Sequence, residues 1–169
     1  MKQQFVAKHP WTILAAGAAI QVLTGLPAAW GVFQQPVMEE YGLSEQGAGY
    51  AFGILIAAFG VGCVLGGFLQ DRHGPRCAGL WGTALLCGGF FAAGLLPPGS
   101  AEAFFLAFSI PAGLGTAFLY PSIQSCAQKW YADRKGLATG VIGGAVGLSG
   151  AFLTVFVLSL IHISEPTRL

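Results

Sequence analysis

Residues 67–76 read Gly67-Phe68-Leu69-Gln70-Asp71-Arg72-His73-Gly74-Pro75-Arg76, a charged segment between two long apolar runs. The run before it has no Asp, Glu, Lys or Arg residue over Gln46–Gln70, and the run after it has none over Cys77–Ala101. Each run is longer than the roughly 20 residues with which a helix crosses a bilayer. The segment is therefore predicted to be a compact turn that holds its charges at one membrane surface.

Runs of this kind fill the chain. Three more stretches without Asp, Glu, Lys or Arg cover Pro10–Met38, Ala103–Gln128 and Gly136–Ser164. Five such runs in succession exclude a soluble fold, and their length and lack of two-residue alternation exclude transmembrane strands. We predict an all-α integral membrane protein with about five transmembrane helices, at residues 11–33, 47–69, 77–96, 104–127 and 136–157.

Composition agrees with this class. Charged residues make up 9% of the chain, whereas about 25% is usual in soluble domains. The net charge of +1 gives no sign of a nucleic-acid partner. Without CxxC or Cys/His spacing, the four cysteines predict neither a metal site nor a disulfide framework: Cys63, Cys77, Cys87 and Cys126. No pattern indicates covalent catalysis, so we expect a protein that is not an enzyme and has no cofactor.

The basic residues predict the orientation, because cytoplasmic loops are enriched in Lys and Arg. The segments that share one membrane side contain seven of them: Lys2, Lys8, Arg72, Arg76, Lys129, Arg134 and Lys135. The opposite loops contain no Lys or Arg but four acids: Glu39, Glu40, Glu45 and Glu102. We expect a multi-pass protein of the plasma or inner membrane whose N-terminus is cytoplasmic.

Local signals predict helix ends, kinks and contacts. Ser44 is the expected N-cap of the second helix, and the Pro-Pro-Gly-Ser segment at 97–100 is expected to end the third. Kinks in the first and fourth helices are predicted at Pro27, Pro111 and Pro121. Small residues four apart predict close helix packing, either static or sliding: Gly62/Gly66, Gly140/Gly144 and Gly143/Gly147.

The end of the chain has a different character. Residues Leu158–Arg168 resemble a translated sequencing adapter, the mosaic end of transposase-based libraries. We therefore expect residues 1–157 to be a partial N-terminal transmembrane half and residues 158–169 to be a non-native tail. On this expectation the chain is a fragment of a longer protein.

Three segments carry a family resemblance. The pattern G-x-L-x-D-R-x-G-x-R in residues 67–76 resembles the loop between helices 2 and 3 of the major facilitator superfamily of secondary transporters. Trp30–Pro36 and Lys129–Ala138 resemble segments of the oxalate/formate antiporter family and the related monocarboxylate transporters. Members of that branch often have Tyr two residues before the Trp, where this chain has Ala28.

The resemblance implies about twelve helices in two six-helix halves, with the substrate held at the midplane between them. This chain then supplies about five helices of the first half, and its partners are the missing C-terminal half, the lipid bilayer and a small organic anion. In oxalate-type members the cations that hold the carboxylate lie in the second half. The remaining cavity candidates are polar or aromatic residues within the spans: Gln21, Trp30, Tyr120 and Gln124. Interhelical hydrogen bonding, or interfacial anchoring by Trp30, is the alternative role.

The charged segment suggests a conformational latch on the cytoplasmic side. Gly67 allows close approach of a helix from the other half, and Asp71 faces the positive N-terminus of that helix in this hypothesis. Arg76 is expected to pair with Asp133. The predicted latch consists of Gly67, Asp71, Arg72, Gly74, Arg76 and Asp133. The alternative is that these residues only determine membrane topology.

Two functions remain open at this stage. The first is an N-terminal fragment of a secondary active transporter, such as an antiporter, that carries mono- or dicarboxylates by alternating access. The second is a complete small multi-pass membrane protein that acts as a homo-oligomer or an assembly partner. No GxxxxGK loop indicates driving by ATP, and no charged ring or filter-like loop favours a channel.

Overall fold

The structure, a computed structural model, describes residues 10–164. Lys2, Lys8 and the end of the predicted tail, Glu165–Leu169, lie outside the described residues. Within 10–164 the regular secondary structure is helical and includes no strand. Five helical stretches are long and apolar enough to cross a membrane. The predicted all-α class and the number of spans are therefore confirmed.

Breaks and irregular turns divide the five spans into shorter elements. The first span is α1 (Pro10–Thr24) followed by α2 (Leu26–Tyr41), the second is α3 (Glu45–His73) and the third is α4 (Pro75–Gly94). The fourth span joins α5 (Ala101–Phe104), the π-helical turn η1 (Phe105–Ser109) and α6 (Ile110–Trp130). After a 3-10 turn, η2 (Ala132–Arg134), the fifth span is α7 (Lys135–Ser164).

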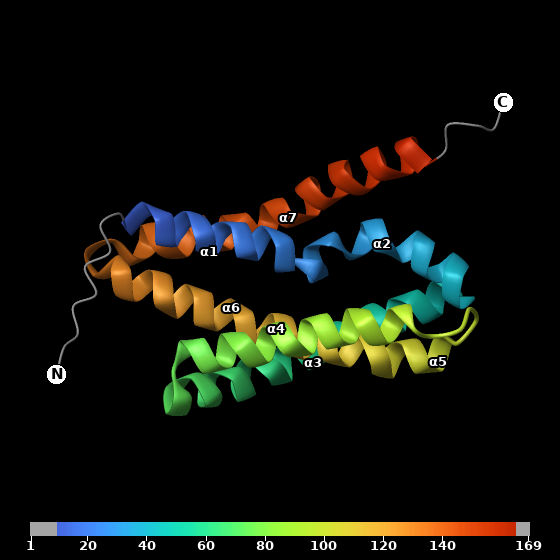
Figure 1. The fold of residues 1–169 in the computed structure, drawn as a ribbon, viewed down its shortest axis with the longest axis horizontal. Coiled ribbons are helices and arrows are strands. Elements are labelled where there is room, and N and C mark those ends of the chain that lie inside the picture. The colour runs from blue at the N-terminus through green and yellow to red at the C-terminus, as the bar shows by residue number, and fades with distance from the viewer. Residues whose placement is uncertain (1–9, 165–169) are drawn as a thin grey trace.

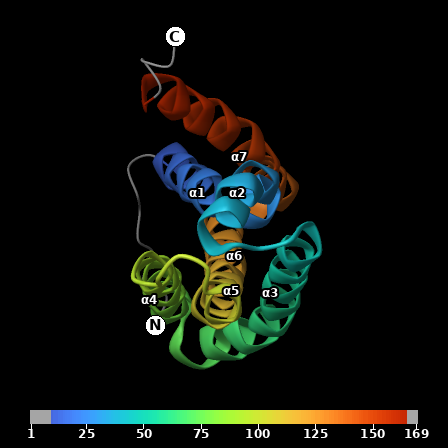
Figure 2. The same cartoon turned by 90° about the vertical axis from the view of Figure 1, so that its right-hand side faces the viewer.

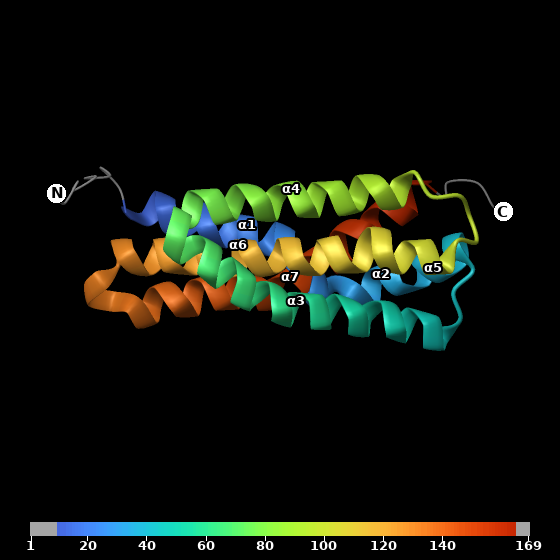
Figure 3. The same cartoon turned by 90° about the horizontal axis from the view of Figure 1, so that it is seen from below.

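Helix α6 lies at the centre of the bundle. Seen end-on in Figure 2, α3 and α4 lie on either side of α6, whereas α7 lies beside α1 and α2. Figures 1 and 3 show the spans running roughly along one axis. The described helices thus form two groups, one of α3, α4 and α6 and one of α1, α2 and α7. The groups meet where α6 contacts α1 and α7 and where α2 contacts α3.

Glycines bring α6 into very close contact with both of its neighbours. A Cβ atom placed on Gly62 of α3 would lie 2.6 Å from a side chain of α6, and one on Gly66 would lie 2.9 Å from Cδ1 of Phe118. On the other side, a Cβ on Gly115 would lie 2.7 Å from the carbonyl oxygen of Gly82 in α4. The close packing predicted at Gly62 and Gly66 is confirmed, because no side chain fits at these distances.

An aromatic cluster fills the bundle where α2, α3 and the π-helical turn meet. The ring of Trp30 stacks 6.0 Å from that of Phe52 and 6.4 Å from that of Phe108, measured between centroids. The hydroxyl of Tyr41 donates a hydrogen bond to the backbone carbonyl of Ala93 at 2.9 Å. This contact ties the end of α2 to the end of α4.

The first two spans begin as predicted but end later. Ser44 caps α3, because its Oγ accepts a hydrogen bond from the backbone N–H of Gly47 at 3.1 Å. The predicted end of the first helix at residue 33 is wrong, because the helix continues to Tyr41. It stops at Gly42, whose φ of +64° is left-handed and suits a glycine C-cap.

The charged turn is also shorter than predicted. Helix α3 continues to His73, so that Asp71 and Arg72 lie in its last turn rather than in a loop. Only Gly74 separates α3 from α4, and its φ of +86° lies in a region that favours glycine. At the other end of the chain, α7 continues to Ser164, beyond the predicted end at residue 157. The non-native character of residues 158–169 stays a prediction.

Two of the three prolines lie next to irregular backbone. The first span breaks at Gly25, two residues before Pro27. The π-helical turn η1 comes two residues before Pro111, which lies in the first turn of α6, whereas Pro121 lies within the continuous helix. A proline lacks the N–H donor and its ring crowds the carbonyl four residues earlier. The kinks predicted at Pro27 and Pro111 thus correspond to a break and a π-helical turn.

Charges lie at opposite ends of the bundle. The turn at Gly74 and η2 lie at the end where α1 begins, on the left in Figure 1, and the α2–α3 and α4–α5 connections lie at the other end. The Lys and Arg residues of the described chain lie at the first end, and the four acids Glu39, Glu40, Glu45 and Glu102 lie at the second. Which end is cytoplasmic stays a prediction.

Adjacent glycines of α3 provide a matched test of the α3–α6 contact. Gly66→Leu forces a side chain into Phe118, whereas Gly67→Leu adds the same side chain where a Cβ has nothing within 4 Å. Overpacking costs about 1–3 kcal/mol, so we expect Gly66→Leu to lower the thermal unfolding temperature of the detergent-solubilised chain. Gly67→Leu should leave it unchanged or raise it, since Leu favours a helix more than Gly. Equal unfolding temperatures for the two variants would contradict the contact.

Candidate substrate cavity and charged turn

Gln21 of α1 is the most deeply buried of the predicted cavity residues, with 1% of its surface exposed. The hydroxyl of Thr24 donates to the carbonyl of Ile20 at 2.8 Å, and its one proton is shared more weakly with Oε1 of Gln21 at 3.3 Å. Within the described chain, the Nε2 atom of Gln21 has no hydrogen-bond partner. Leaving a buried donor unpaired costs about 1–3 kcal/mol. This amide is therefore a candidate donor to a ligand or to a helix beyond the described residues.

The break at Gly25 lies one helical turn after Gln21. The carbonyl of Gly25 accepts a hydrogen bond at 3.0 Å from the hydroxyl of Ser149, a fully buried residue of α7. A Cβ on Gly25 would collide with the Ser149 side chain and lie only 2.5 Å from its Cβ. The Gly25 carbonyl also accepts the backbone N–H of Ala29 at 3.3 Å, and the Ser149 hydroxyl is shared with the carbonyl of Val146 at 2.6 Å. The break is thus tied to α7 by an additional, shared polar contact.

Gln124 and Tyr120 lie in α6 on either side of Pro121. The Oε1 atom of Gln124 is buried and has no hydrogen-bond partner in the part of the chain that the structure describes. Tyr120 is half-buried, and its ring centroid lies 6.4 Å from that of Phe59 in α3. The part of α6 around Pro121 therefore presents an unpaired acceptor, as Gln21 presents an unpaired donor, on two helices that contact each other.

Trp30 lies inside the aromatic cluster, with 7% of its surface exposed. Its ring lies between Phe52 of α3 and Phe108 of the π-helical turn. In this structure the Trp30 ring packs α2 against α3 and against the π-helical turn. A role in contacting substrate stays a prediction.

The charged residues at the turn lie at one end of the bundle but do not pair with each other. Asp71, Arg72, Arg76 and Asp133 are exposed, and none of them forms an ion pair with another described residue. The predicted contact between Arg76 and Asp133 is therefore absent from this structure and stays a prediction for a complete transporter. Gly74 makes the turn, and a Cβ on Gly67 would meet nothing within 4 Å.

One glycine-rich face of α7, like the position of Gly67, has no neighbouring atoms in the described structure. A Cβ on any of four glycines would have nothing within 4 Å: Gly140, Gly143, Gly144 and Gly147. These residues form the two small-residue pairs predicted to promote close helix packing, but no described helix packs on them. Such a surface permits the close approach of a further helix.

Three hydroxyl residues have roles that the sequence did not reveal: Thr24, Ser109 and Ser149. Ser109 is fully buried in the π-helical turn, and its Oγ has no partner among residues 10–164. In the sequence, each of these residues is a hydroxyl residue within a charge-free run and close to a Pro or Gly, and this is the only signal that could have identified it. That signal does not tell which helix the hydroxyl faces, so the contact between Ser149 and Gly25, 124 residues apart, was beyond its reach.

The outer surface of the bundle carries large apolar side chains. Leu80, Trp81 and Phe91 of α4 are 73%, 58% and 72% exposed. Contiguous apolar surface of this kind is unfavourable in water and suits lipid. No group of three or more His, Cys, Asp or Glu residues in the described chain is placed to hold a metal ion. The fold defines a helical membrane protein with buried polar groups inside its spans.

The sequence model of the Major Facilitator Superfamily matches residues 11–165, so the chain belongs to this superfamily. The resemblance seen in its motifs is confirmed. Proteins of this superfamily are multi-pass membrane transporters.

Several curated relatives agree with this assignment. An uncharacterized 38 kDa protein encoded in the 23S RNA operon of Thermoproteus tenax is 32% identical over 91% of this chain. The oxalate:formate antiporter of Oxalobacter formigenes is 26% identical over 75% of it, and a probable nitrate/nitrite transporter of Mycobacterium tuberculosis is 36% identical over 66%. The matched regions span 41%, 30% and 28% of the lengths of these three relatives.

A double substitution tests the contact between the break and α7. We expect Gly25→Ala to destabilise the solubilised chain by about 1–3 kcal/mol, because its methyl group meets Ser149. Adding Ser149→Gly should restore part of the lost stability, since it removes the colliding atoms. Gly31→Ala in α2 is the matched control, because a Cβ there meets nothing within 4 Å. Additive losses in thermal unfolding of the double variant would contradict the contact.

Proposed function

We propose that this chain is part of a secondary active transporter that moves a small oxyanion across the membrane by alternating access. Small organic anions such as mono- or dicarboxylates are the first candidate substrates. The observation that carries the proposal is the buried, unpaired Nε2 donor of Gln21 next to the break at Gly25. Discontinuous helices with exposed polar groups often form the substrate sites of transporters.

A negatively charged substrate requires positively charged side chains near it, and this chain has no Lys or Arg in the middle of its described spans. All Lys and Arg residues of the described chain lie at the ends of the helices. An anion near the bilayer centre is costly without a cation beside it. In this proposal Gln21 and Gln124 orient the substrate, and the compensating cation comes from the other half of the longer protein.

Nitrate is the second candidate substrate. Carboxylates and nitrate are both planar anions whose oxygens accept hydrogen bonds, so an amide donor suits either. The oxalate:formate antiporter supports the organic anion, and the relative described as a probable nitrate/nitrite transporter supports the inorganic one. The two candidates therefore share a site chemistry and differ in size and in the number of charged groups.

The charged turn supports the latch hypothesis within the same proposal. Asp71 lies in the last turn of α3, where the partial negative charge of the helix end disfavours an acid. Since no described residue pairs with it, a positive partner from the other half would relieve this repulsion. Arg76 and Asp133 complete the cluster, and the open surface at Gly67 leaves room for the partner helix. We place this end of the bundle, with the N-terminus, on the cytoplasmic side of the cell membrane.

Uptake by the full-length protein tests the substrate proposal. The reading frame is recovered from its source, and the purified protein is reconstituted into liposomes with labelled oxalate, formate or nitrate. We expect saturable uptake of one of these anions. Gln21→Met should raise the KM by roughly tenfold or more, because a hydrogen bond to a charged group contributes about 1.5–3 kcal/mol.

Gln128→Met is the matched control for this experiment. Its Nε2 already donates to the Thr139 hydroxyl at 2.9 Å, so its loss should affect stability more than the KM. Equal KM changes in the two variants would contradict a substrate role for Gln21. Saturable uptake by the 169-residue chain alone would favour the alternative of a complete small protein that acts as a homo-oligomer.

Asp71→Asn tests the latch in the full-length transporter. We expect normal insertion and a two- to thirtyfold slower uptake, because each charge contact of this kind contributes roughly 0.3–2 kcal/mol. Glu45→Gln at the other end of α3 is the control, since that acid lies in the first turn of the helix. Unchanged uptake by correctly inserted Asp71→Asn protein would rule out the latch and leave a role in topology.

A further inference from the structure

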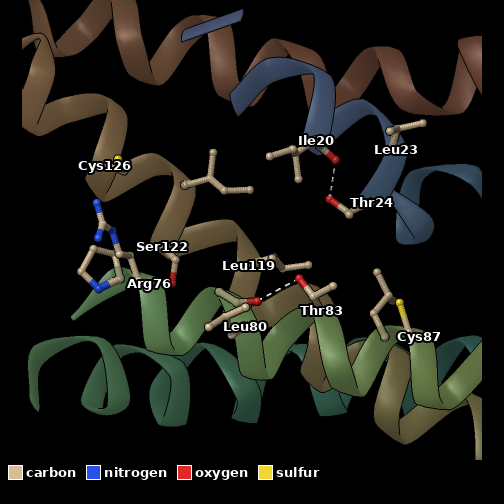
Figure 4. A pocket seen from close by; sticks show the side chains of 14 residues that line it. Ile20, Leu23, Thr24, Arg76, Leu80, Thr83, Cys87, Leu119, Ser122 and Cys126 are labelled. Atoms are coloured by element: carbon tan, nitrogen blue, oxygen red, sulfur yellow. Dashed lines mark hydrogen bonds between the residues drawn. The ribbon is translucent and has the colours of Figure 1, made fainter. Parts of the chain in front are cut away.

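Ser109 lacks the hydrogen bond that other hydroxyl residues make within the described spans. Six of them donate to the carbonyl four residues earlier in their own helix, at 2.6–2.9 Å: Thr24, Thr83, Thr116, Ser122, Thr154 and Ser159. Figure 4 shows these bonds for Thr24 and Thr83, on two helices that line one pocket. Ser109 is fully buried, yet its Oγ has no partner among residues 10–164. A buried hydroxyl without a partner is costly, so its position requires a physical explanation.

The π-helical turn around Ser109 explains this difference. A turn closed by i→i+5 hydrogen bonds contains one residue more than an α-helical turn, and η1 contains this extra residue within Phe105–Ser109. The carbonyl of Phe105, four residues before Ser109, is therefore not where an α-helix would place it. If η1 became α-helical, this carbonyl would take up the position in which it accepts the Ser109 hydroxyl. The π-helical turn and the unpaired hydroxyl are thus two signs of one local arrangement.

The loss of the extra residue would shift the outer part of the fourth span by one position. With α6 held in place, Phe105 moves to the position that Phe104 has now, and α5 turns by about 100° and moves about 1.5 Å toward the end of the bundle. Since both residues are Phe, the aromatic cluster keeps a ring at this position in either register. The non-helical residues 95–100 separate α5 from α4 and accommodate the displacement. The sequence therefore allows two registers with similar packing.

The contacts on the two sides of η1 differ in kind. On the inner side α6 packs through glycine, and a Cβ on Gly113 would collide with the backbone carbonyl of Leu55 in α3. On the outer side the contacts are between rings, with centroids 4.6 Å apart for Tyr41 and Phe104. Backbone contacts of this closeness are lost when a helix turns, whereas a ring contact forms again with the neighbouring Phe. The outer part of the span is therefore the part that shifts.

We propose that the fourth span exchanges between two registers during transport. One register contains η1, as in this structure. In the other, the span is α-helical through Ser109, whose hydroxyl then donates to the carbonyl of Phe105. The inference rests on the proposed function, in which the chain is part of a transporter that works by alternating access.

The ring contacts connect this turn to the candidate substrate residues. The ring centroid of Phe108 in η1 lies 6.4 Å from that of Trp30 in α2. Helix α2 begins after the break at Gly25, one helical turn after Gln21. Coupling between two sites requires a two-state element that both of them bias, and η1 is such an element in this proposal. Binding of an anion at Gln21 would thus favour one register through α2.

Cross-linking that reads the register tests the proposal in the full-length protein, reconstituted in liposomes. Tyr41→Cys is combined with Phe104→Cys in one variant and with Phe105→Cys in another, after the four native cysteines are changed to Ser. We expect a short bifunctional thiol reagent to link both pairs, the first in the register seen here and the second in the shifted one. Ala103→Cys with Tyr41→Cys is the matched control and should not be linked, because the shift moves residue 103 farther away.

The ratio of the two cross-link yields shows whether the shift belongs to transport. Saturating oxalate, formate or nitrate should change this ratio. Ser109→Ala should lower the share of the Phe105 cross-link by roughly fivefold, the effect of one net hydrogen bond that forms only in that register. Thr116→Ala should leave the ratio unchanged, because its bond to the carbonyl of Ala112 lies within α6 and is present in both registers. Linkage of the Phe104 pair alone, with and without anion, would overturn the register shift.

Deletion of Leu106 provides a second measurement. Leu106 lies in η1 and is 69% exposed, so its deletion removes the extra residue and leaves Phe104 one α-helical turn before Ser109. We expect this variant to keep its unfolding temperature, to form only the cross-link at Phe104 and to lose most of its uptake. The control is Leu106→Ala, which preserves the length of the span and should transport normally. Equal uptake by the two variants would overturn a role of the shift in transport.

Uptake by the otherwise unmodified protein is measured separately. Linkage at Phe105 without uptake of any of the three anions would overturn the proposed function alone. Uptake without linkage at Phe105 would overturn the register shift alone.

Discussion

The close approach of α6 to α3 and α4 is the contact on which the rest of the bundle depends. In lipid, apolar side chains gain little by leaving their solvent, so helices associate through tight packing and hydrogen bonds. Gly62 and Gly66 on one side and Gly82 and Gly115 on the other allow this packing by removing the side chains that would separate the backbones. The aromatic cluster around Trp30 then fills the space between α2, α3 and the π-helical turn.

A second constraint acts where the helices are irregular. Backbone carbonyls inside a membrane require partners, and the carbonyl of Gly25 accepts from the backbone N–H of Ala29 and from the hydroxyl of Ser149. The Nε2 atom of Gln21, the Oε1 atom of Gln124 and the hydroxyl of Ser109 lack such partners within residues 10–164. Unpaired groups of this kind are costly. Three of the five such atoms in the described residues lie in the first and fourth spans, and the other two are Oε1 of Gln70 in α3 and the hydroxyl of Tyr131 after α6.

The sequence was sufficient for the features that depend on local chemistry. Charge-free runs predicted the five spans, Ser44 was found as a cap from its position before an apolar run, and Gly62 and Gly66 were found from their spacing. The end of the first helix was wrong because the acids at 39 and 40 were read as loop residues, although they favour a helix and only Gly42 stops it. The charged turn is likewise shorter than predicted, because its charged residues continue α3 and only Gly74 ends that helix.

The site depended on information that a single sequence does not contain. Periodicity shows which residues share a helix face but not which helix they face, so Gln21 was identified as a polar residue in a span while its neighbour Thr24 and the distant Ser149 were not. The absence of an ion pair between Arg76 and Asp133 is likewise a matter of how two turns lie relative to each other. The turn at Gly74 and η2 were correctly predicted to lie at the same end of the bundle. Two turns at the same depth in the membrane can still be too far apart laterally for their side chains to meet.

The number of spans has a consequence for how the chain enters a membrane. An odd number of crossings leaves Pro10 and Ser164 at opposite surfaces of the bilayer, as the two ends of the bundle in Figure 1 illustrate. Material joined to one end and material joined to the other would therefore occupy different compartments. In the orientation proposed above, α7 crosses the membrane away from the basic residues that precede it, so that its far end lies on the side opposite to them.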